Sequence, residues 1–461
     1  MARSGKPKRI ISINPFNGKK LAEITPTSTK ELEKIISKSR RAQSRLMELS
    51  LNQRAVIAKN ILKAIGDDAE DIAKVTTLET GLPIKSSTGL VSALIDRGRW
   101  FIDNSKRYLK PEVIDLKDGI VNEICFEPVG VVAIISSWNA PASQTIWCAI
   151  PAILAGNTVI HKSSEFSSLC SKKLQQAFDK AAIPPGIVQT VYGDKALGQS
   201  LVEGCDFIAF AGSIRAGQDV IRRSAARMSR LSMELGGRDI LLVLNDADID
   251  KAAAAAVTGG FKHCGQSCNA VECAYVDPRV MNEFTEKVLE HAGALKVADP
   301  MDPLTDIGPM ANRPSFEKTQ SFYKDAVAKG AKVIFGGRRL GAKGFLMEPA
   351  ILTNINNNMR LAKEEVFGPI LPIRPLKDID KVMDEVNMSE YGLGFSVWSR
   401  NISKAKRIAA KALVGTAVVN GLPRTNISCP WGGMRKTGLG RILSHFGIRC
   451  FTEQKNLRYP K

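Results

Sequence analysis

The chain has 461 residues, of which 44% are hydrophobic and 24% are charged, and its formal net charge is +19. This length exceeds one small core and predicts two or three domains of ordinary globular composition. Lysines and arginines are interspersed with acidic residues, which predicts a solvated basic surface and no nucleic-acid partner. The sequence has no run of about 18 apolar residues, and its basic N-terminus lacks the apolar core of a signal peptide. These features predict a cytoplasmic protein with no membrane partner.

The cysteines and histidines exclude two common kinds of site. Nine cysteines, an odd number, are scattered through the chain, which is unlike a disulfide framework and favours a reducing compartment. Four histidines occur without a His-Glu-x-x-His motif. Cys264 and Cys268 lie four residues apart, but no second pair completes a metal site. We therefore expect no bound metal.

The first 110 residues predict a hairpin and a set of scaffold helices. Residues 9–25 place Asn-Pro-Phe-Asn-Gly between two short apolar stretches, a pattern typical of a β-hairpin. Ser28 followed by Glu31 forms a capping box, which predicts a helix start. Helical spacing of apolar residues predicts further helices at 51–65, 69–78 and 90–105, with Gly66 ending the first of them.

The next segment predicts a hairpin and then a buried strand. Residues 112–127 read as two strands joined by a Lys-Asp-Gly turn, and the apolar run at 129–135 predicts a parallel strand. That strand runs into Ser-Ser-Trp-Asn-Ala-Pro. Ligands of open α/β sheets gather at the carboxyl ends of strands, so Asn139 would lie where its amide can stabilise a developing oxyanion. An asparagine that merely opens a turn is the alternative.

Strands and helices then alternate, which predicts an α/β fold. The predicted elements are helices at 143–154 and 168–182 and strands at 158–162, 188–191 and 207–210. The last strand runs into Ala-Gly-Ser-Ile-Arg-Ala-Gly at 211–217, whose glycines would let a diphosphate approach the N–H groups of a helix start. No Gly-x-Gly-x-x-Gly fingerprint is present. The alternation restarts at Asp239, so we expect a Rossmann-like cofactor domain and a second doubly wound α/β catalytic domain.

Residues 233–276 carry a candidate nucleophile and a candidate base. Glu234 precedes a Leu-Gly-Gly turn, and Cys268 stands in Gly-Gln-Ser-Cys. A thiolate can attack a carbonyl, and a carboxylate can later activate water. Either residue alone is more simply a packed cysteine or a surface glutamate. Together they indicate covalent catalysis.

Glu-Leu-Gly-Gly at 234–237 followed by Gly-Gln-Ser-Cys at 265–268 resembles the aldehyde dehydrogenase superfamily, in its NAD(P)-dependent, non-acylating type. The resemblance extends from about Asn14 to about Thr452. It implies oxidation of an aldehyde to the carboxylic acid through a thiohemiacetal and a thioester on Cys268. Asn139 and the backbone N–H of Cys268 would hold the oxyanion, and Glu234 would be the general base.

The resemblance also implies a nicotinamide cofactor. Lys162 and Glu165 would hold the adenosine ribose, while Glu365 and Phe367 would contact the nicotinamide riboside. A carboxylate at Glu165 would repel a 2′-phosphate, which favours NAD, with NADP as the alternative. Ser163 replaces a proline that is common in the family. The remaining expected cofactor contacts are Trp138, Ser164, Gly212, Ser213, Gly217, Leu235 and Gly236.

The domain division follows from the same resemblance. We expect an NAD-binding domain at 1–109 and 128–236 and a catalytic domain at 237–435. An oligomerisation arm at 110–127 and a C-terminal segment at 436–461 would complete the chain. Such an arm predicts a homodimer or a homotetramer.

The substrate pocket is expected to include Trp147 and Lys262. Relatives that oxidise carboxylate-bearing semialdehydes have arginines at these two positions, so Trp147 removes one cation and favours neutral medium-chain or aromatic aldehydes. Lys262, with Arg424, keeps a semialdehyde such as succinic semialdehyde as the alternative. A CoA-acylating enzyme and a non-catalytic paralogue are further alternatives, against which Glu234 and the complete set of catalytic residues argue.

Overall fold

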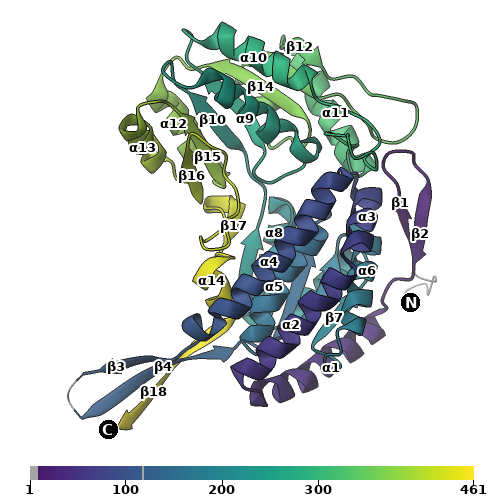
Figure 1. Cartoon of the computed structure of the whole chain (residues 1–461), viewed down its shortest axis with the longest axis vertical. Helices are drawn as coiled ribbons and strands as arrows, with labels where there is room; N and C mark the ends of the chain where they lie inside the picture. The colour runs from purple at the N-terminus through teal and green to yellow at the C-terminus, as the bar shows by residue number, and fades with distance from the viewer. Residues whose placement is uncertain (1–8, 117–118) are drawn as a thin grey trace.

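The computed structural model describes residues 9–116 and 119–461. Two lobes, each built on its own sheet, lie one above the other, and a narrow arm projects from the lower lobe (Figure 1). The predicted Lys-Asp-Gly turn falls on Lys117 and Asp118, which lie outside the described residues. None of the helices within the described ranges combines the length and apolar character needed to cross a bilayer.

The lower lobe contains a six-stranded sheet in the order β17-β9-β8-β5-β6-β7. All neighbours are parallel except β17, which pairs antiparallel with β9. The strand order reverses beside β5, where the chain runs to β6 on one side and later to β8 on the other, and such a switch point is where ligands bind. The strands are β5 (Val131–Ser136), β6 (Thr158–Ser163), β7 (Val188–Val191), β8 (Phe207–Ala211), β9 (Arg230–Glu234) and β17 (Gly438–Leu439).

Alternating apolar side chains let β5 face two helical layers. Val132 and Ile134 pack into one core, while Val131, Ala133 and Ile135 pack into the core on the opposite face. A strand buried on both faces is apolar throughout, which explains the uninterrupted run in the sequence. The first layer consists of α2 (Leu51–Asp67), α3 (Ala69–Thr80), α4 (Ile84–Tyr108), α5 (Pro141–Leu154) and α6 (Ser168–Lys180). The second consists of α1 (Thr29–Glu48), α7 (Lys195–Gly204) and α8 (Ile214–Ser224).

The upper lobe contains a seven-stranded sheet in the order β12-β13-β14-β11-β10-β15-β16, parallel except for the β12–β13 pair. Its strands are β10 (Asp239–Val243), β11 (Val271–Val276), β12 (Lys332–Gly336), β13 (Ala350–Thr353), β14 (Ile370–Pro375), β15 (Gly394–Trp398) and β16 (Thr416–Val419). The helices packed on it are α9 (Ile249–Phe261), α10 (Met281–Gly293), α11 (Arg313–Ala328), α12 (Ile379–Met388) and α13 (Ile402–Lys411). The α/β fold class is therefore confirmed.

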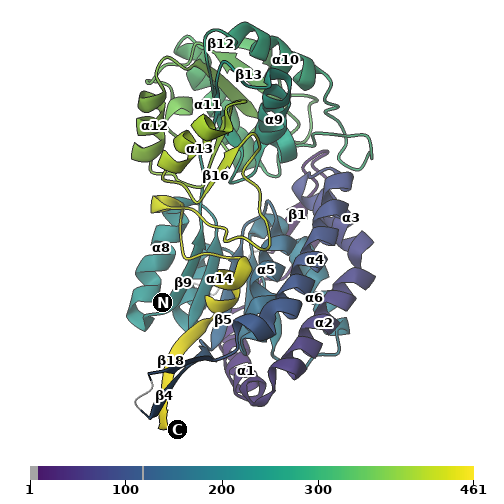
Figure 2. The ribbon, with the colours of Figure 1, turned by 60° about the vertical axis from the view of Figure 1, so that its left-hand side comes forward.

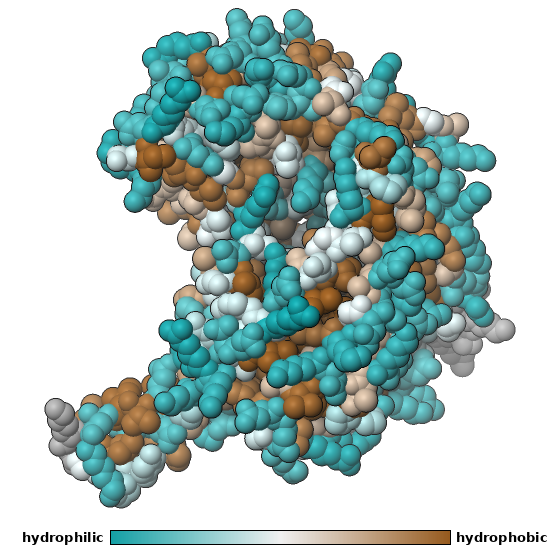
Figure 3. Space-filling view, in the orientation of Figure 1, coloured by the Kyte–Doolittle hydropathy of each residue, from teal (hydrophilic) through white to brown (hydrophobic). Residues whose placement is uncertain are grey.

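The arm is a three-stranded antiparallel sheet in the order β18-β4-β3. It consists of β3 (Glu112–Asp115), β4 (Ile120–Pro128) and β18 (Thr452–Pro460). Apolar side chains gather on the arm surface (Figure 3), among them Val113, Leu116 and Leu457, which are 62%, 61% and 46% exposed. Before it enters the arm, the C-terminal segment passes beneath the upper lobe and forms β17 and the short helix α14 (Ser444–Arg449) against the lower lobe (Figure 2).

The N-terminal elements lie where the sequence predicts, although each of the helices α2, α3 and α4 is longer than predicted. β1 (Ile10–Ile13) and β2 (Lys20–Ile24) form the hairpin, and the Ser28 capping box begins α1. Helix α2 continues through Gly66 to Asp67, and α4 begins at Ile84 rather than at Leu90. Gly66 has a negative φ and is part of the helix. The glycine that ends a helix in this region is Gly81, which has a left-handed conformation at the end of α3.

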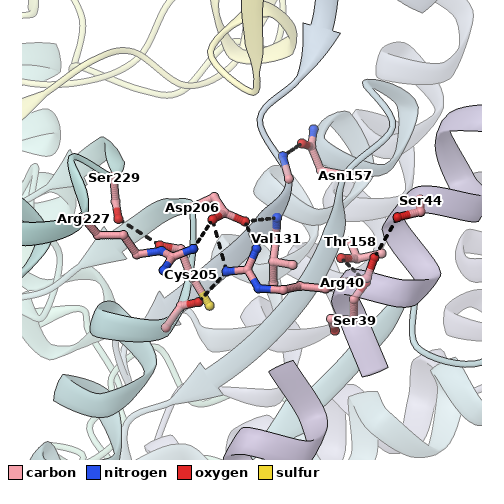
Figure 4. Close-up of polar contacts among 12 residues, drawn as sticks. Ser39, Arg40, Ser44, Val131, Asn157, Thr158, Cys205, Asp206, Arg227 and Ser229 are labelled. Atoms are coloured by element: carbon pink, nitrogen blue, oxygen red, sulfur yellow. Dashed lines mark hydrogen bonds and ion pairs between the residues drawn. The ribbon is translucent and has the colours of Figure 1, made fainter. Parts of the chain in front are cut away.

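An ionic cluster fastens the lower sheet at the end opposite the switch-point loops (Figure 4). Asp206 Oδ2 accepts hydrogen bonds from Val131 N and Arg40 Nη1, both at 2.9 Å, and Asp206 Oδ1 accepts one from Arg227 Nη2 at 2.8 Å. A Cβ at Gly130, where φ is +124°, would lie only 2.6 Å from Asp206 Oδ2. Asp206 thus links α1, β5, β8 and the 3-10 turn after α8.

Candidate active site

A pocket of about 190 Å³ lies where β5, β8 and β9 end. Asn139, Glu234 and Cys268, which are far apart in the sequence, all line it. Seven of the predicted cofactor residues line the same pocket: Trp138, Gly212, Ser213, Leu235, Gly236, Glu365 and Phe367. The pocket therefore collects the predicted nucleophile, the predicted base, the predicted amide donor and most of the predicted cofactor contacts, from both lobes.

Cys268 is presented by an unusual turn after α9. His263 and Cys264 have φ of 54° and 56°, and Gly265 follows with φ of 68°. Left-handed conformations are unfavourable for residues with a Cβ, so this turn persists only because its surroundings hold it. A Cβ at Gly265 would lie 2.2 Å from Gly368 O, and one at Gly237 would lie 2.0 Å from Cys268 O. Close backbone packing fixes the cysteine in place.

The electrostatic environment of Cys268 disfavours its thiolate. Burial raises the pKa of the thiol, and the nearby carboxyl groups of Glu234, Asp239 and Glu365 raise it further, while its own backbone N–H acts in the opposite direction. The group is therefore a thiol in the absence of a compensating positive charge. A nicotinamide ring, which is cationic in its oxidised form, would supply such a charge.

Asn139 is oriented by several hydrogen bonds. Its Oδ1 accepts from Ser137 Oγ at 2.5 Å, and its Nδ2 donates to Gln266 O at 3.0 Å. Nδ2 carries two hydrogens, so one remains to donate to an oxyanion. The backbone N–H of Cys268 is the second donor available in the pocket.

Glu234 ends β9 and has an environment suited to a base that works near neutral pH. Burial raises its pKa to about 8, although the charge of Arg441 and the indole of Trp431 lower it in part. Its Oε1 atom is buried and has no hydrogen-bond partner among the described residues. Glu234 is therefore largely protonated at pH 7 and becomes a better base as the pH rises.

The cofactor side of the pocket includes one cation that sequence reasoning missed. Lys318 lines the pocket from α11, and its Nζ donates to Glu365 O at 2.9 Å. Glu365 accepts from Gly237 N at 2.8 Å, and burial raises its pKa to about 7. Glu272 holds the same loop by accepting from Val366 N and Phe367 N. Lys318 carries no motif, so only the fold could reveal it.

The aromatic and glycine positions leave room suited to a flat ring and a diphosphate. The Phe367 ring meets the Trp138 ring edge-on at 5.5 Å between centroids. Ser213 is the N-cap of the 11-residue helix α8, and both Ser213 and Gly212 line the pocket. The N-terminus of α8, with its unpaired N–H groups, therefore lies beside the pocket. A Cβ at Gly217 would lie 2.7 Å from Leu235, so this glycine allows α8 to pack closely on the strand. These residues fit a dinucleotide.

Four predicted cofactor residues lie outside this pocket. Gly217 is in α8, and the other three follow β6: Lys162 is buried and donates to Ser163 O at 2.9 Å, whereas Glu165 is exposed at the start of a 3-10 turn capped by Ser164. Burial lowers the pKa of Lys162, and the carboxylates of Glu165 and Asp194 act against that shift. Strand β6 is next to β5, so these residues lie one strand away from Asn139.

The two predicted substrate residues have different surroundings. Lys262 is exposed just after α9. Trp147 lies on α5, and its ring is covered by the guanidinium of Arg97 at 4.3 Å. Arg97 comes from α4 and also donates to Thr425 Oγ1 at 2.7 Å. Sequence reasoning missed Arg97, although it interrupts the apolar face formed by Leu94, Gly98 and Phe101 on α4.

Comparisons with known proteins place this arrangement in one family. The model of the aldehyde dehydrogenase family matches residues 2–457. Betaine aldehyde dehydrogenase of Bacillus subtilis is 30% identical over 98% of this chain and 95% of its own length. A probable NADP-dependent succinate-semialdehyde dehydrogenase of Sinorhizobium fredii is 31% identical over 98% of this chain and 93% of its own.

Solved structures agree with these relatives. An aldehyde dehydrogenase from Brucella melitensis biovar abortus superposes with a TM-score of 0.94 at 32% identity, over 98% of this chain and 94% of its own. An NADP-dependent enzyme of Escherichia coli gives a TM-score of 0.95 at 29% identity, over 98% of this chain and 95% of its own. The chain therefore belongs to the aldehyde dehydrogenase family and is an NAD(P)-dependent enzyme that oxidises an aldehyde.

Proposed function

We propose that Cys268 is the nucleophile, Asn139 an oxyanion donor and Glu234 the general base of a hydrolytic aldehyde oxidation. The observation that carries this proposal is that all three side chains line one pocket with the predicted cofactor residues. Residues 1–109 and 128–236 would form the cofactor domain and residues 237–435 the domain that carries the nucleophile. The arm at 110–127 and the C-terminal segment at 436–461 complete this division.

The pocket supports a two-stage reaction. Cys268 loses its thiol proton to solvent and attacks as the thiolate, which forms a carbon–sulfur bond. The resulting oxyanion accepts hydrogen bonds from Asn139 Nδ2 and Cys268 N. A nicotinamide cofactor, when bound at these residues, would supply the hydride acceptor. Cys268 then carries a thioester. Glu234 accepts a proton from water, the hydroxide attacks the thioester, and the acid leaves as the Cys268 sulfur is released.

Two substitutions test these roles. Cys268→Ala should reduce NADH formation at least about 10³-fold while the affinity for NAD, measured by fluorescence titration, stays within about twofold. Glu234→Gln should still release about one NADH per active site in a rapid burst but should slow the steady state about 100-fold, because deacylation loses its base. Turnover by Cys268→Ala, or a steady-state rate of Glu234→Gln equal to wild type, would contradict the scheme.

Glu234 also supports water rather than CoA as the acyl acceptor. A CoA-acylating enzyme has no need of a base that activates water, whereas Glu234 stands at the end of β9 in the pocket. Adding CoA to the assay should leave the steady-state rate of NADH formation unchanged. An increase of more than about fivefold would make CoA the physiological acceptor.

We further propose NAD as the preferred cofactor. Glu165 is exposed beside the buried Lys162, and a carboxylate there would repel a 2′-phosphate. Some relatives are named for NADP, so membership of the family does not by itself set the cofactor preference. The proposal of NAD therefore rests on Glu165 of this chain.

For the substrate, Trp147 supports a neutral medium-chain or aromatic aldehyde. The exposed position of Lys262 supports the same proposal, because a solvated ammonium binds a carboxylate weakly. Trp147 and Cys268 are both partly buried and pack against the same hydrophobic core.

Arg97 favours a second candidate, an aldehyde with a carboxylate. Its guanidinium is partly buried over Trp147 and donates to Thr425, and no acidic side chain of the described residues pairs with it. Burial lowers the pKa of Arg97, so a substrate carboxylate would restore the lost solvation. Succinate-semialdehyde dehydrogenases are among the relatives.

One comparison separates the two substrate candidates. The neutral proposal expects kcat/KM for hexanal or benzaldehyde to exceed that for succinic semialdehyde in the wild type. The anionic candidate expects the reverse order, with a loss of about tenfold or more for succinic semialdehyde in Arg97→Met and little change for hexanal. Lys262→Ala is the matched control, since its exposed cation should change neither ratio.

The arm supports a homodimer or homotetramer, because its exposed apolar residues need a covering surface.

All nine cysteines are unpaired, which supports a reducing cytoplasm as the compartment.

A further inference from the structure

A second, smaller cavity adjoins the main pocket at Glu234. It leaves about 30 Å³ of space and is lined by Ser136, Ser232, Cys148 and Ile442, and it shares Glu234, Gln144 and Ala211 with the main pocket. The space exists because β8 has small residues between β5 and β9. Ala209 pairs with Ser232 and Ile134, and Ala211 pairs with Glu234.

Two polar atoms that line this cavity lack a hydrogen-bond partner within the described chain. They are Glu234 Oε1 and Ser232 Oγ, and both are buried. Ser232 is only 2% exposed and lies two residues before Glu234 on β9, so both side chains point to the same face of the sheet. An unsatisfied buried carboxylate oxygen is costly, and about 30 Å³ exceeds the roughly 10–15 Å³ that one water requires.

The hydrogen bonds of His161 show where the Ser136 hydroxyl points. Thr145 Oγ1 donates its hydrogen to Pro141 O at 2.7 Å, so it can only accept from His161 Nε2, which lies 2.9 Å away. Nε2 therefore carries the proton, and this single N–H is shared between Thr145 Oγ1 and Ser136 Oγ, which lies 2.9 Å away. His161 is neutral, because burial and the charge of Lys162 lower its pKa to about 3. The hydroxyl hydrogen of Ser136 is thus left to point into the cavity.

We propose that this cavity is a water-binding site in which a water accepts hydrogen bonds from Ser136 and Ser232 and donates one to Glu234 Oε1. Ser136 and Ser232 are positioning residues that stabilise the ionised, catalytically competent form of Glu234. This rests on the proposed role of Glu234 as the base. The water needs two to four polar partners, and these three side chains supply them.

Several charged or titratable groups face Glu234 and enter its pH dependence. Arg441 and the indole of Trp431 favour the carboxylate, while the thiols of Cys268 and of Cys148 on α5 also interact with Glu234. Burial raises the pKa of Cys148 to about 12, so this thiol stays neutral in the range of interest. The proposed water in the small cavity would donate one further hydrogen bond to Glu234 Oε1.

The experiment compares deacylation in Ser232→Ala, Ser136→Ala and wild type over roughly pH 6 to 9.5. Loss of a donor to the carboxylate should raise the pKa that governs deacylation by about one unit, so the steady-state rate near pH 7 should fall about tenfold. The NADH burst should keep its amplitude, and the rates should converge with wild type above about pH 9. A merely structural defect would lower the rate equally at every pH.

Two variants serve as controls. Ser232→Thr keeps the hydroxyl and should restore the wild-type profile. Ser224→Ala removes another buried serine, on α8 and outside the cavity, and should leave the profile unchanged. A crystal structure should show density for a water within hydrogen-bond distance of Ser232 Oγ and Glu234 Oε1.

Three results overturn the inference, and a fourth removes its premise. A pH profile of Ser232→Ala and Ser136→Ala that overlays wild type, a rate loss that is independent of pH, or a dry cavity in the crystal each contradicts the water site. Unchanged steady-state turnover of Glu234→Gln would instead remove the base role of Glu234 itself, so the two failures are distinguishable.

Discussion

Cys268 shares its surroundings with the carboxyl groups of Glu234, Asp239 and Glu365, which together with burial raise its pKa. A nucleophile held as a thiol is protected from oxidation and alkylation until a positive charge arrives. These carboxyl groups therefore protect the thiol of Cys268 in the resting pocket.

The protection of Cys268 can be measured without turnover. In the absence of cofactor, the rate of Cys268 alkylation by iodoacetamide should keep rising through pH 9, because the pKa of the thiol is raised. Glu234→Gln removes one negative charge, lowers that pKa, and should speed alkylation at pH 9 at least about threefold. Mass spectrometry of the tryptic peptide measures the rate, with the exposed Cys429 as the internal reference. Equal rates in the two proteins would show that Glu234 does not act on the thiol.

Glu165 allows a second prediction for a single residue. The ratio of kcat/KM for NAD to that for NADP should exceed one in the wild type and should fall about tenfold or more in Glu165→Gln, because the repulsion of a 2′-phosphate is lost. Stopped-flow or steady-state absorbance at several cofactor concentrations gives the ratio. A wild type that prefers NADP contradicts this expectation.

At the scale of the elements, the Asp206 cluster joins helices and strands that the sequence separates widely (Figure 4). Burial alone would raise the pKa of Asp206, but hydrogen bonds from Arg227, Arg40 and Val131 N lower it below its usual value. A carboxyl with a lowered folded-state pKa stabilises the fold above its unfolded pKa, near about 4, and loses this contribution as the pH falls through the folded pKa.

Asp206→Asn should therefore lower the free energy of unfolding by about 2–3 kcal/mol at pH 7 and by less near pH 3. Urea unfolding followed by circular dichroism at the two pH values gives the comparison. Asp96→Asn, which breaks an exposed pair with Arg99, should change the same quantity by less than about 0.5 kcal/mol. A loss for Asp206→Asn that does not depend on pH would contradict the electrostatic account.

Elements with strong local signals could be predicted from the sequence, and those set by tertiary contacts could not. The apolar run of β5 and the Ser28 capping box are local, so their strand and helix were predicted. β17 has two residues and exists only because Gly438 pairs with Glu234. Arg97 and Lys318 carry no motif, and their places beside Trp147 and Glu365 depend on the packing of distant helices.

At the scale of the whole molecule, the arm leaves apolar side chains without a neighbour in one chain. We expect the wild type to form the proposed homo-oligomer and Val113→Asp combined with Leu457→Asp to be monomeric, because each change places a charge on the exposed apolar arm (Figure 3). Light scattering coupled to size exclusion measures the mass. Met388→Asp, at an 85% exposed site on α12, is the control and should leave the mass unchanged. A wild-type monomer would contradict the prediction.

The pairing of β17 with β9 also constrains when the enzyme can first act during its synthesis. Gly438 of β17 pairs with Glu234 of β9, and Leu235 N donates to Thr437 O at 2.7 Å. A segment near the C-terminus therefore forms the neighbouring strand of β9, which ends in the proposed base Glu234. A nascent chain halted on the ribosome before residue 437 already contains Asn139, Glu234 and Cys268, yet its Glu234 lacks this neighbouring strand. Catalysis should therefore begin only after residues 437–439 have emerged, which keeps unfinished polypeptides from turning over a reactive aldehyde.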